Sequence, residues 1–144
     1  MIDNIQHEYT EREKQMYISF NIPYPTTKAG RTEWNRRYGL NAYYSGKHWS
    51  MRKKDAEYWH YLVRSELRRQ LPKRTVLKSP VVLTFYYNDN LDLSNHACMA
   101  KMIEDALKGI IIEDDSRKHV KGIEHYFHGE DFIRVIVKEV DSID

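Results

Sequence analysis

The sequence lacks any long hydrophobic run, and this absence excludes a large class of proteins. No apolar stretch within the 144 residues approaches the roughly 18 residues that a membrane-spanning helix needs. The polar start, MIDNIQHEYTEREKQ, has no apolar segment of the kind found in a signal peptide. We therefore expect a cytoplasmic protein with no membrane partner.

Cysteine is nearly absent as well, since Cys98 is the single one and cannot form an internal disulfide. The spacing of the seven histidines matches no structural zinc site. His125 and His128 lie three residues apart on an expected strand, so their side chains point to opposite faces. There is no glycine-rich phosphate loop, and a Ser94 or Cys98 nucleophile lacks an evident base.

Charge is plentiful and unevenly distributed along the chain. The net charge of +2 conceals a basic block from residue 28 to residue 74, with 13 Lys and Arg against 4 Asp and Glu, a balance of +9. Aromatic residues lie within the same block: Trp34, Tyr38, Tyr43, Tyr44 and Trp49. Such a block suits a polyanion, most often nucleic acid. The alternative is a solvated, lysine-rich surface.

Hydrophobic periodicity predicts one α+β domain over residues 1–144, with a small mixed β-sheet and two main helices. We expect strands at Met16–Ile22, at Val81–Tyr87 and in the segments VKGIEHYFH and FIRVIVKEV, the last two joined by a turn at Gly129. Helices are expected at about Ser50–Leu71 and Ser94–Lys108. Residues 1–14 are expected to form a loose leader and Thr26–Trp49 a long loop. The order is β-α-β-α-β-β.

The first expected helix has two contrasting faces. Trp59, Leu62, Val63 and Leu67 share an apolar face at helical spacing. Lys53, Lys54, Tyr61, Arg64 and Arg68 fall on the opposite side. This is an amphipathic surface helix whose basic side can also follow DNA phosphates. The DNA contacts that we predict are Lys53, Lys54, Arg64 and Arg68 on this helix and Arg36 and Arg37 before it.

Two acidic clusters flank the second expected helix. Asp92, with Ser94 and Asn95 beside it, precedes the helix, and Glu113, Asp114 and Asp115 follow it. On the helix, Ser94, Cys98, Lys101 and Asp105 share the side opposite to the apolar residues Met99, Met102, Ile103, Ala106 and Leu107. The bland interpretation is helix capping before the helix and an exposed Lys101–Asp105 ion pair on it. If the second cluster folds back, Asp92 and Asp115 converge and can hold Mg²⁺ over a phosphate.

Taken together, the stretch DLSNHACMAKMIEDALKGIIIEDDSRKHV resembles the RusA family of Holliday-junction resolvases, which are found largely in phages and prophages. The family pattern is an Asp-x-Asp-Asn segment, a helix with Lys and Asp-Ala-Leu, and then an Asp-Asp turn. The matching residues here are Asp92, Asn95, Lys101, Asp105-Ala106-Leu107 and Asp114-Asp115. The segment ISFNIPYPTTK is similar to the family's opening strand and Pro-x-Pro loop. With a preceding helix and a terminal hairpin, the resemblance covers most of the chain.

The resemblance implies a homodimeric hydrolase of DNA recombination and repair that makes paired nicks in four-way junctions. It implies Mg²⁺ or Mn²⁺ held by Asp92 and Asp115, with Asp105 and Asp114 as candidates for a further ligand or a supporting role. Lys101 would contact the scissile phosphate or the leaving oxygen, and Asn95 would orient Asp92. Ser94 departs from the pattern, because the family expects a second Asp there. A DNA-binding dimer with weak or lost catalysis is therefore the main rival hypothesis, and a small RNA-binding domain is a more distant one.

Overall fold

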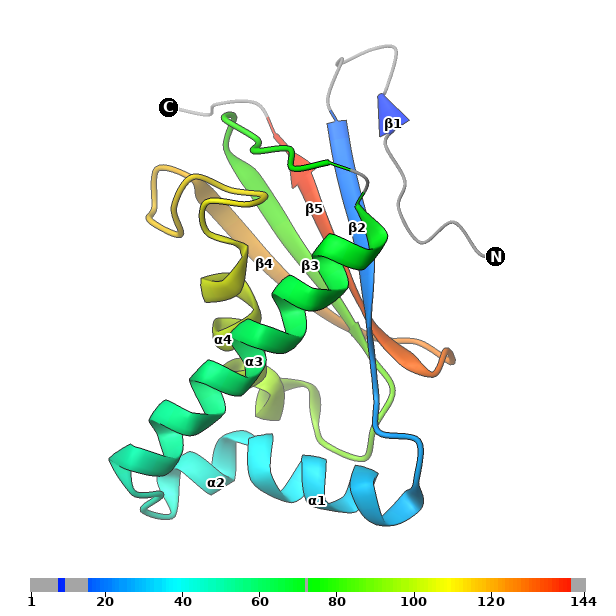
Figure 1. Ribbon diagram of the computed structural model, residues 1–144, viewed down its shortest axis with the longest axis vertical. Coiled ribbons are helices and arrows are strands. Elements are labelled where there is room, and N and C mark those ends of the chain that lie inside the picture. Colours follow the sequence, from blue (N-terminus) through cyan, green and yellow to red (C-terminus); the bar gives the residue numbers. More distant parts are fainter. Residues whose placement is uncertain (1–7, 10–15, 72, 141–144) are drawn as a thin grey trace.

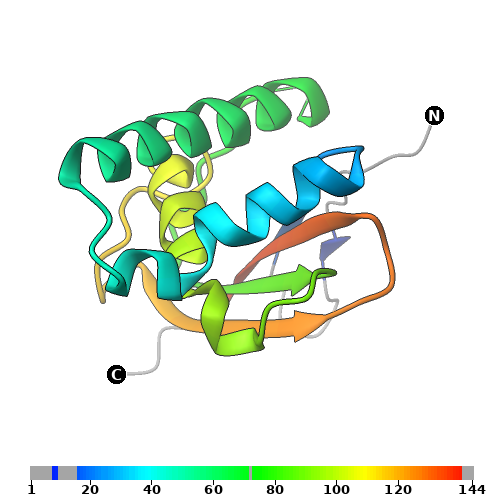
Figure 2. The same cartoon turned by 90° about the horizontal axis from the view of Figure 1, so that it is seen from below.

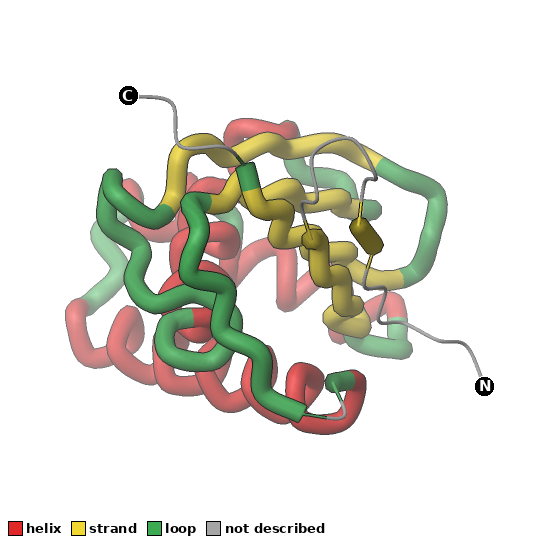
Figure 3. The backbone as a smooth tube through the Cα atoms, turned by 90° about the horizontal axis from the view of Figure 1, so that it is seen from above, coloured by secondary structure: helices red, strands yellow, loops and turns green. Residues whose placement is uncertain are grey.

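A five-stranded mixed sheet forms the frame of the molecule, and the helices cover one of its faces. The computed structural model describes residues 8–9, 16–71 and 73–140. Figures 1 and 2 show the helices gathered on one side of the sheet, and Figure 3 separates strands from helices by colour. None of the helices in these residues is both long and apolar enough to cross a membrane.

The strands are β1 (Glu8–Tyr9), β2 (Met16–Pro23), β3 (Val81–Tyr87), β4 (Val120–Phe127) and β5 (Phe132–Glu139). Their order across the sheet is β1-β2-β5-β3-β4. β3 and β4 pair in parallel, and the other neighbours are antiparallel. Side chains of β3 alternate between buried and half-buried, as expected for a strand with one covered face. The predicted α+β class with a mixed sheet is confirmed.

The predicted hairpin between the last two strands is wrong. β4 and β5 lie on opposite sides of β3, so the turn that joins them must cross the end of that strand. Two hydrogen bonds hold the turn there: the His128 amide donates to the Tyr87 carbonyl (2.9 Å), and Asn88 Nδ2 donates to the Glu130 carbonyl (2.9 Å). Strand pairing is a long-range property, and local turn chemistry at Gly129 does not determine it.

The helices are α1 (Lys28–Tyr38), α2 (Leu40–Tyr44), α3 (Trp49–Gln70), the 3₁₀ helix η1 (Leu93–His96) and α4 (Ala97–Leu107). The two long helices were predicted within a few residues of these bounds. The predicted loop at 26–49 is wrong, because α1 and α2 occupy most of it. Thr27 Oγ1 accepts the Gly30 amide (2.9 Å) and starts α1. Only two side chains of α1 are buried, too few to produce a visible helical period.

An aromatic cluster joins α1 to α3. The ring of Trp34 lies 4.8 Å from that of Trp59 and 5.2 Å from that of Tyr38, and all three side chains are buried. Trp34 and Tyr38 therefore belong to the core and are not part of a nucleic-acid surface. The predicted apolar face of α3 is confirmed for Trp59, Val63 and Leu67. Of the predicted leader, residues 8–9 form β1 and the rest lie outside the described residues.

Candidate active site

Three predicted catalytic residues meet on the exposed side of α4. Lys101 Nζ lies 2.6 Å from Asp115 Oδ2 and 3.0 Å from Asp105 Oδ1. Lys108 Nζ lies 3.5 Å from Asp105 and 3.4 Å from Asp115. These four residues form the α4 cluster, in which two ammonium groups and two carboxylates alternate.

The local sequence explains how the α4 cluster forms. Lys101, Asp105 and Lys108 lie four and three residues apart on α4 and therefore share one side of the helix. The helix ends before Gly109, whose φ of +77° suits a residue without a side chain. Ile111 and Ile112 are then buried against the core, which turns the chain back along α4 and brings Asp115 to the lysines.

Electrostatics fix the charges of the α4 cluster. The hydrogen bond from Lys101 holds the pKa of Asp115 far below its usual range, and the same bond raises the pKa of Lys101 above its usual range. Glu104 lies 3.7 Å from Lys101, and burial raises the pKa of its carboxyl. At neutral pH the cluster therefore contains an ionised Asp115 and a charged Lys101. The Lys101 side chain is 59% exposed and accessible to a ligand, whereas that of Asp115 is only 17% exposed.

The side chain of Asp92 caps no helix in the described residues. Asp92 directly precedes η1, yet its side chain makes no capping hydrogen bond, and its carboxylate is exposed. Ser94 is exposed as well, and α4 begins after His96, again without a side-chain cap. Asn95 Oδ1 accepts the Asn41 amide at the start of α2 (3.2 Å), so it is committed to α2. The capping interpretation is wrong for Asp92, and its exposed carboxylate is available for another role.

The expected convergence of Asp92 with Asp115 on a metal ion stays a prediction. No three Asp, Glu, His or Cys side chains within that part of the chain are grouped to hold a metal ion. Asp115 contacts lysines instead, and Asp114 is exposed beside it. The donor atoms nevertheless fit Mg²⁺, which takes carboxylate oxygens and often needs only one or two from protein when phosphate and water supply the rest.

The sequence analysis missed a buried pair beneath the Asp92 loop. His96 Nε2 lies 2.8 Å from both carboxylate oxygens of Asp89, and its Nδ1 lies 3.0 Å from the Leu93 carbonyl. Tyr24 donates its hydroxyl to Asp89 (3.3 Å), and burial raises the pKa of this phenol well above its usual range. The pair fixes both ends of the loop that carries Asp92. Asp89 lies in the same polar segment, but nothing local in the sequence indicates that His96 is its partner.

The six predicted DNA contacts divide into two groups. Lys53, Lys54 and Arg68 are exposed on α3, and no ion pair is found for them among the described residues. The other three are engaged within the protein. Arg36 bonds Glu33 (2.5 Å), Arg37 bonds Asp55 (2.7 Å), and Arg64 donates to the carbonyls of Ala106 and Lys108 (3.3 Å each). The first group is available to phosphates. In the second, Arg37 and Arg64 connect parts of the fold, whereas Arg36 forms an exposed pair along α1.

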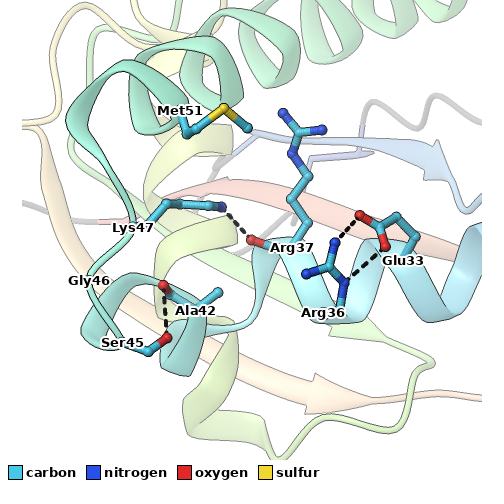
Figure 4. Close-up of a pocket in the computed structure, with 8 residues that line it drawn as sticks. All are labelled: Glu33, Arg36, Arg37, Ala42, Ser45, Gly46, Lys47 and Met51. Atoms are coloured by element: carbon cyan, nitrogen blue, oxygen red, sulfur yellow. Dashed lines mark hydrogen bonds and ion pairs between the residues drawn. The ribbon is translucent and has the colours of Figure 1, made fainter.

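Arg36, Arg37 and Lys47 line a pocket of about 390 Å³ between α1, α2 and α3, shown in Figure 4. Its polar groups largely satisfy one another. Lys47 Nζ donates to the Arg37 carbonyl (2.6 Å), and both side chains contact the buried carboxylate of Asp55. The pocket is thus a polar contact region between helices, and the carboxylates of Asp55 and Glu33 offset most of its positive charge.

Comparison with models of known protein families finds no match for this chain, and comparison with the curated proteins finds none. The features of the chain that bear on its function are the α4 cluster, the exposed carboxylate of Asp92 and the cations of α3.

Proposed function

We propose that the protein is a metal-dependent endonuclease that resolves Holliday junctions by paired nicking, in the manner of the RusA family. The observation that carries the proposal is the α4 cluster, which joins Lys101, Asp105 and Asp115 on an exposed helix side. Carboxylates can hold the metal ion of a metal-dependent phosphodiester cleavage, and a lysine can stabilise the charge that develops. Helix α3 packs against α4 and supplies cations for the phosphates. We further propose that the protein acts in the cytoplasm of a bacterial host and is encoded by a phage or prophage.

The proposed roles follow from charge and exposure. Asp92 and Asp115 would hold Mg²⁺ or Mn²⁺, with Asp105 and Asp114 able to add an oxygen. A bound ion of this kind polarises a phosphoryl group and activates water. Lys101 carries a positive charge to the phosphate or the leaving oxygen, and its raised pKa keeps it charged. Two copies related by a two-fold axis would match the symmetry of a four-way junction and make the paired nicks.

The alternative function is a DNA-binding dimer with weak or no catalysis. Two observations favour it: Ser94 stands where the resemblance expects a carboxylate, and no three-ligand group is present among the described residues. This alternative retains the cations of α3 and assigns the α4 cluster a structural role.

A cleavage assay separates the two functions. Purified protein is incubated with labelled four-way junctions or linear duplex, in Mg²⁺, Mn²⁺ or EDTA. We expect nicks close to the branch point that require metal and are absent from the linear duplex. Tight junction binding with no product in either metal would overturn the nuclease proposal and support the DNA-binding dimer.

Ser94→Asp is expected to lower the metal concentration needed for half-maximal cleavage by roughly tenfold, because it adds a charged oxygen near Asp92. The wild type should need high Mg²⁺ and work better with Mn²⁺, which binds such ligands more tightly. Ser79→Asp adds the same charge at an exposed position in the loop before β3 and serves as the control. Equal metal titrations for the wild type and Ser94→Asp would show that residue 94 does not contribute to a metal site.

A further inference from the structure

Two large aromatic side chains of α3 are left in water. Trp49 and Tyr61 are each 70% exposed, although burial of such rings is strongly favourable. The other two tryptophans, Trp34 and Trp59, are buried in the core. Trp49 has a ring neighbour in His48, at 5.6 Å between ring centroids, yet most of its surface, like that of Tyr61, is left uncovered.

Cations surround these two rings. Lys53 lies one helical turn after Trp49, and Lys54 and Arg68 lie two turns before and after Tyr61. None of the three cations has an ion pair among the residues described by the structure. Glu57 is exposed on the same side, so positive charge exceeds negative charge there. Tyr61, Lys54 and Arg68 thus share the outer side of α3, while Trp49 and Lys53 lie at the N-terminal end of the helix, with Trp49 about 120° around the helix from Tyr61.

We propose that this outer side of α3 binds single-stranded DNA, with bases stacked on Tyr61 and Trp49. Lys53, Lys54 and Arg68 would neutralise the phosphates of the same strand. Any base can stack on an aromatic ring, and rings combined with cations are how single-stranded nucleic acid is bound without sequence preference. A second copy of this chain is a poorer occupant, because its own cations would face these.

The choice of DNA rests on the proposed function, since a branch point is where bases become unpaired. The rise from Trp49 to Tyr61 is about 18 Å along the helix axis, enough for a strand of several nucleotides. Arg64, between these cations in sequence, bonds the carbonyls of Ala106 and Lys108 at the end of α4. A strand lying on α3 would therefore pass close to the α4 cluster.

Binding of fluorescently labelled dT₁₂ in EDTA tests the proposal without any cleavage readout. We expect Tyr61→Ala and Trp49→Ala each to weaken dT₁₂ binding about tenfold. Tyr61→Phe and Trp49→Phe keep a stacking ring and should retain the affinity of the wild type. Tyr126→Ala removes a 45% exposed ring from β4, away from α3, and should change nothing.

Tryptophan emission provides a second measurement, because Trp49 is exposed and Trp34 and Trp59 are buried. Stacking of a base on Trp49 should quench its emission when dT₁₂ is added, and Trp49→Phe should remove this response. Unchanged dT₁₂ affinity in both alanine variants would overturn the proposal. A duplex of the same length that competes with dT₁₂ as well as unlabelled dT₁₂ does would also overturn the proposal. It would show that the surface binds phosphates without stacking on bases. If junction cleavage fails but these results hold, only the nuclease proposal is lost.

Discussion

Asp92→Asn and Asp115→Asn will each reduce metal-dependent junction cleavage by about a hundredfold or more. Asparagine keeps the size of the side chain but removes the negative charge that a divalent cation needs. Junction affinity should remain nearly unchanged, because neither carboxylate lies among the cations of α3. Single-turnover cleavage rates in Mg²⁺, with gel-shift affinities measured in EDTA, give the two quantities separately.

Two further variants make this prediction specific. Asp105→Asn should have an intermediate effect, because Asp105 bonds Lys101 from the same side of α4. Glu130→Gln neutralises an exposed carboxylate in the turn between β4 and β5 and should cleave normally. If Asp92→Asn cleaves at the normal rate, the exposed carboxylate has no catalytic role. The α4 cluster would then serve only to attach the chain around Asp115 to α4.

Much of the fold could be predicted because its periodicity is local. The strand β3 and the apolar face of α3 are each visible in a short stretch of sequence, and both predictions hold. Helix α1 could not be found in this way, since only Trp34 and Tyr38 are buried on it. The position of β5 between β2 and β3 also has no local signal, because pairing across the sheet is set by the complete core.

In the candidate site, too, the contacts with a local sequence signal were predictable and the others were not. The spacing of Lys101 and Asp105 on one helix implies their contact, and Gly109 marks the turn that returns Asp115 to them. The contact between Asp89 and His96 depends on tertiary packing and was missed. The sequence also could not show which predicted DNA contacts are bonded within the protein. The acidic partner of Arg37, for example, lies on another helix.

Asp55→Asn will lower the free energy of unfolding by about 3 kcal/mol, since it breaks a buried ion pair from one side. The Asp55 side chain is fully buried and is bonded by Arg37 (2.7 Å) and Lys47. Lys47 is only 12% exposed, so loss of the carboxylate leaves a positive charge with little access to water. Urea unfolding followed by circular dichroism measures the change, with the slope expected to stay constant.

Two controls show whether this cost comes from the unpaired charge. Glu33→Gln breaks the exposed pair with Arg36 and should leave the unfolding midpoint unchanged, because water screens that pair. Replacing Asp55 and its more buried partner, as in Asp55→Leu combined with Lys47→Met, should recover most of the lost stability, since the charge that remains, on Arg37, is 34% exposed and reaches water. If the double variant is less stable than Asp55→Asn, the carboxylate stabilises the protein mainly through its hydrogen bonds between α3 and α1. Burial of an unpaired charge would then contribute little to the lost stability.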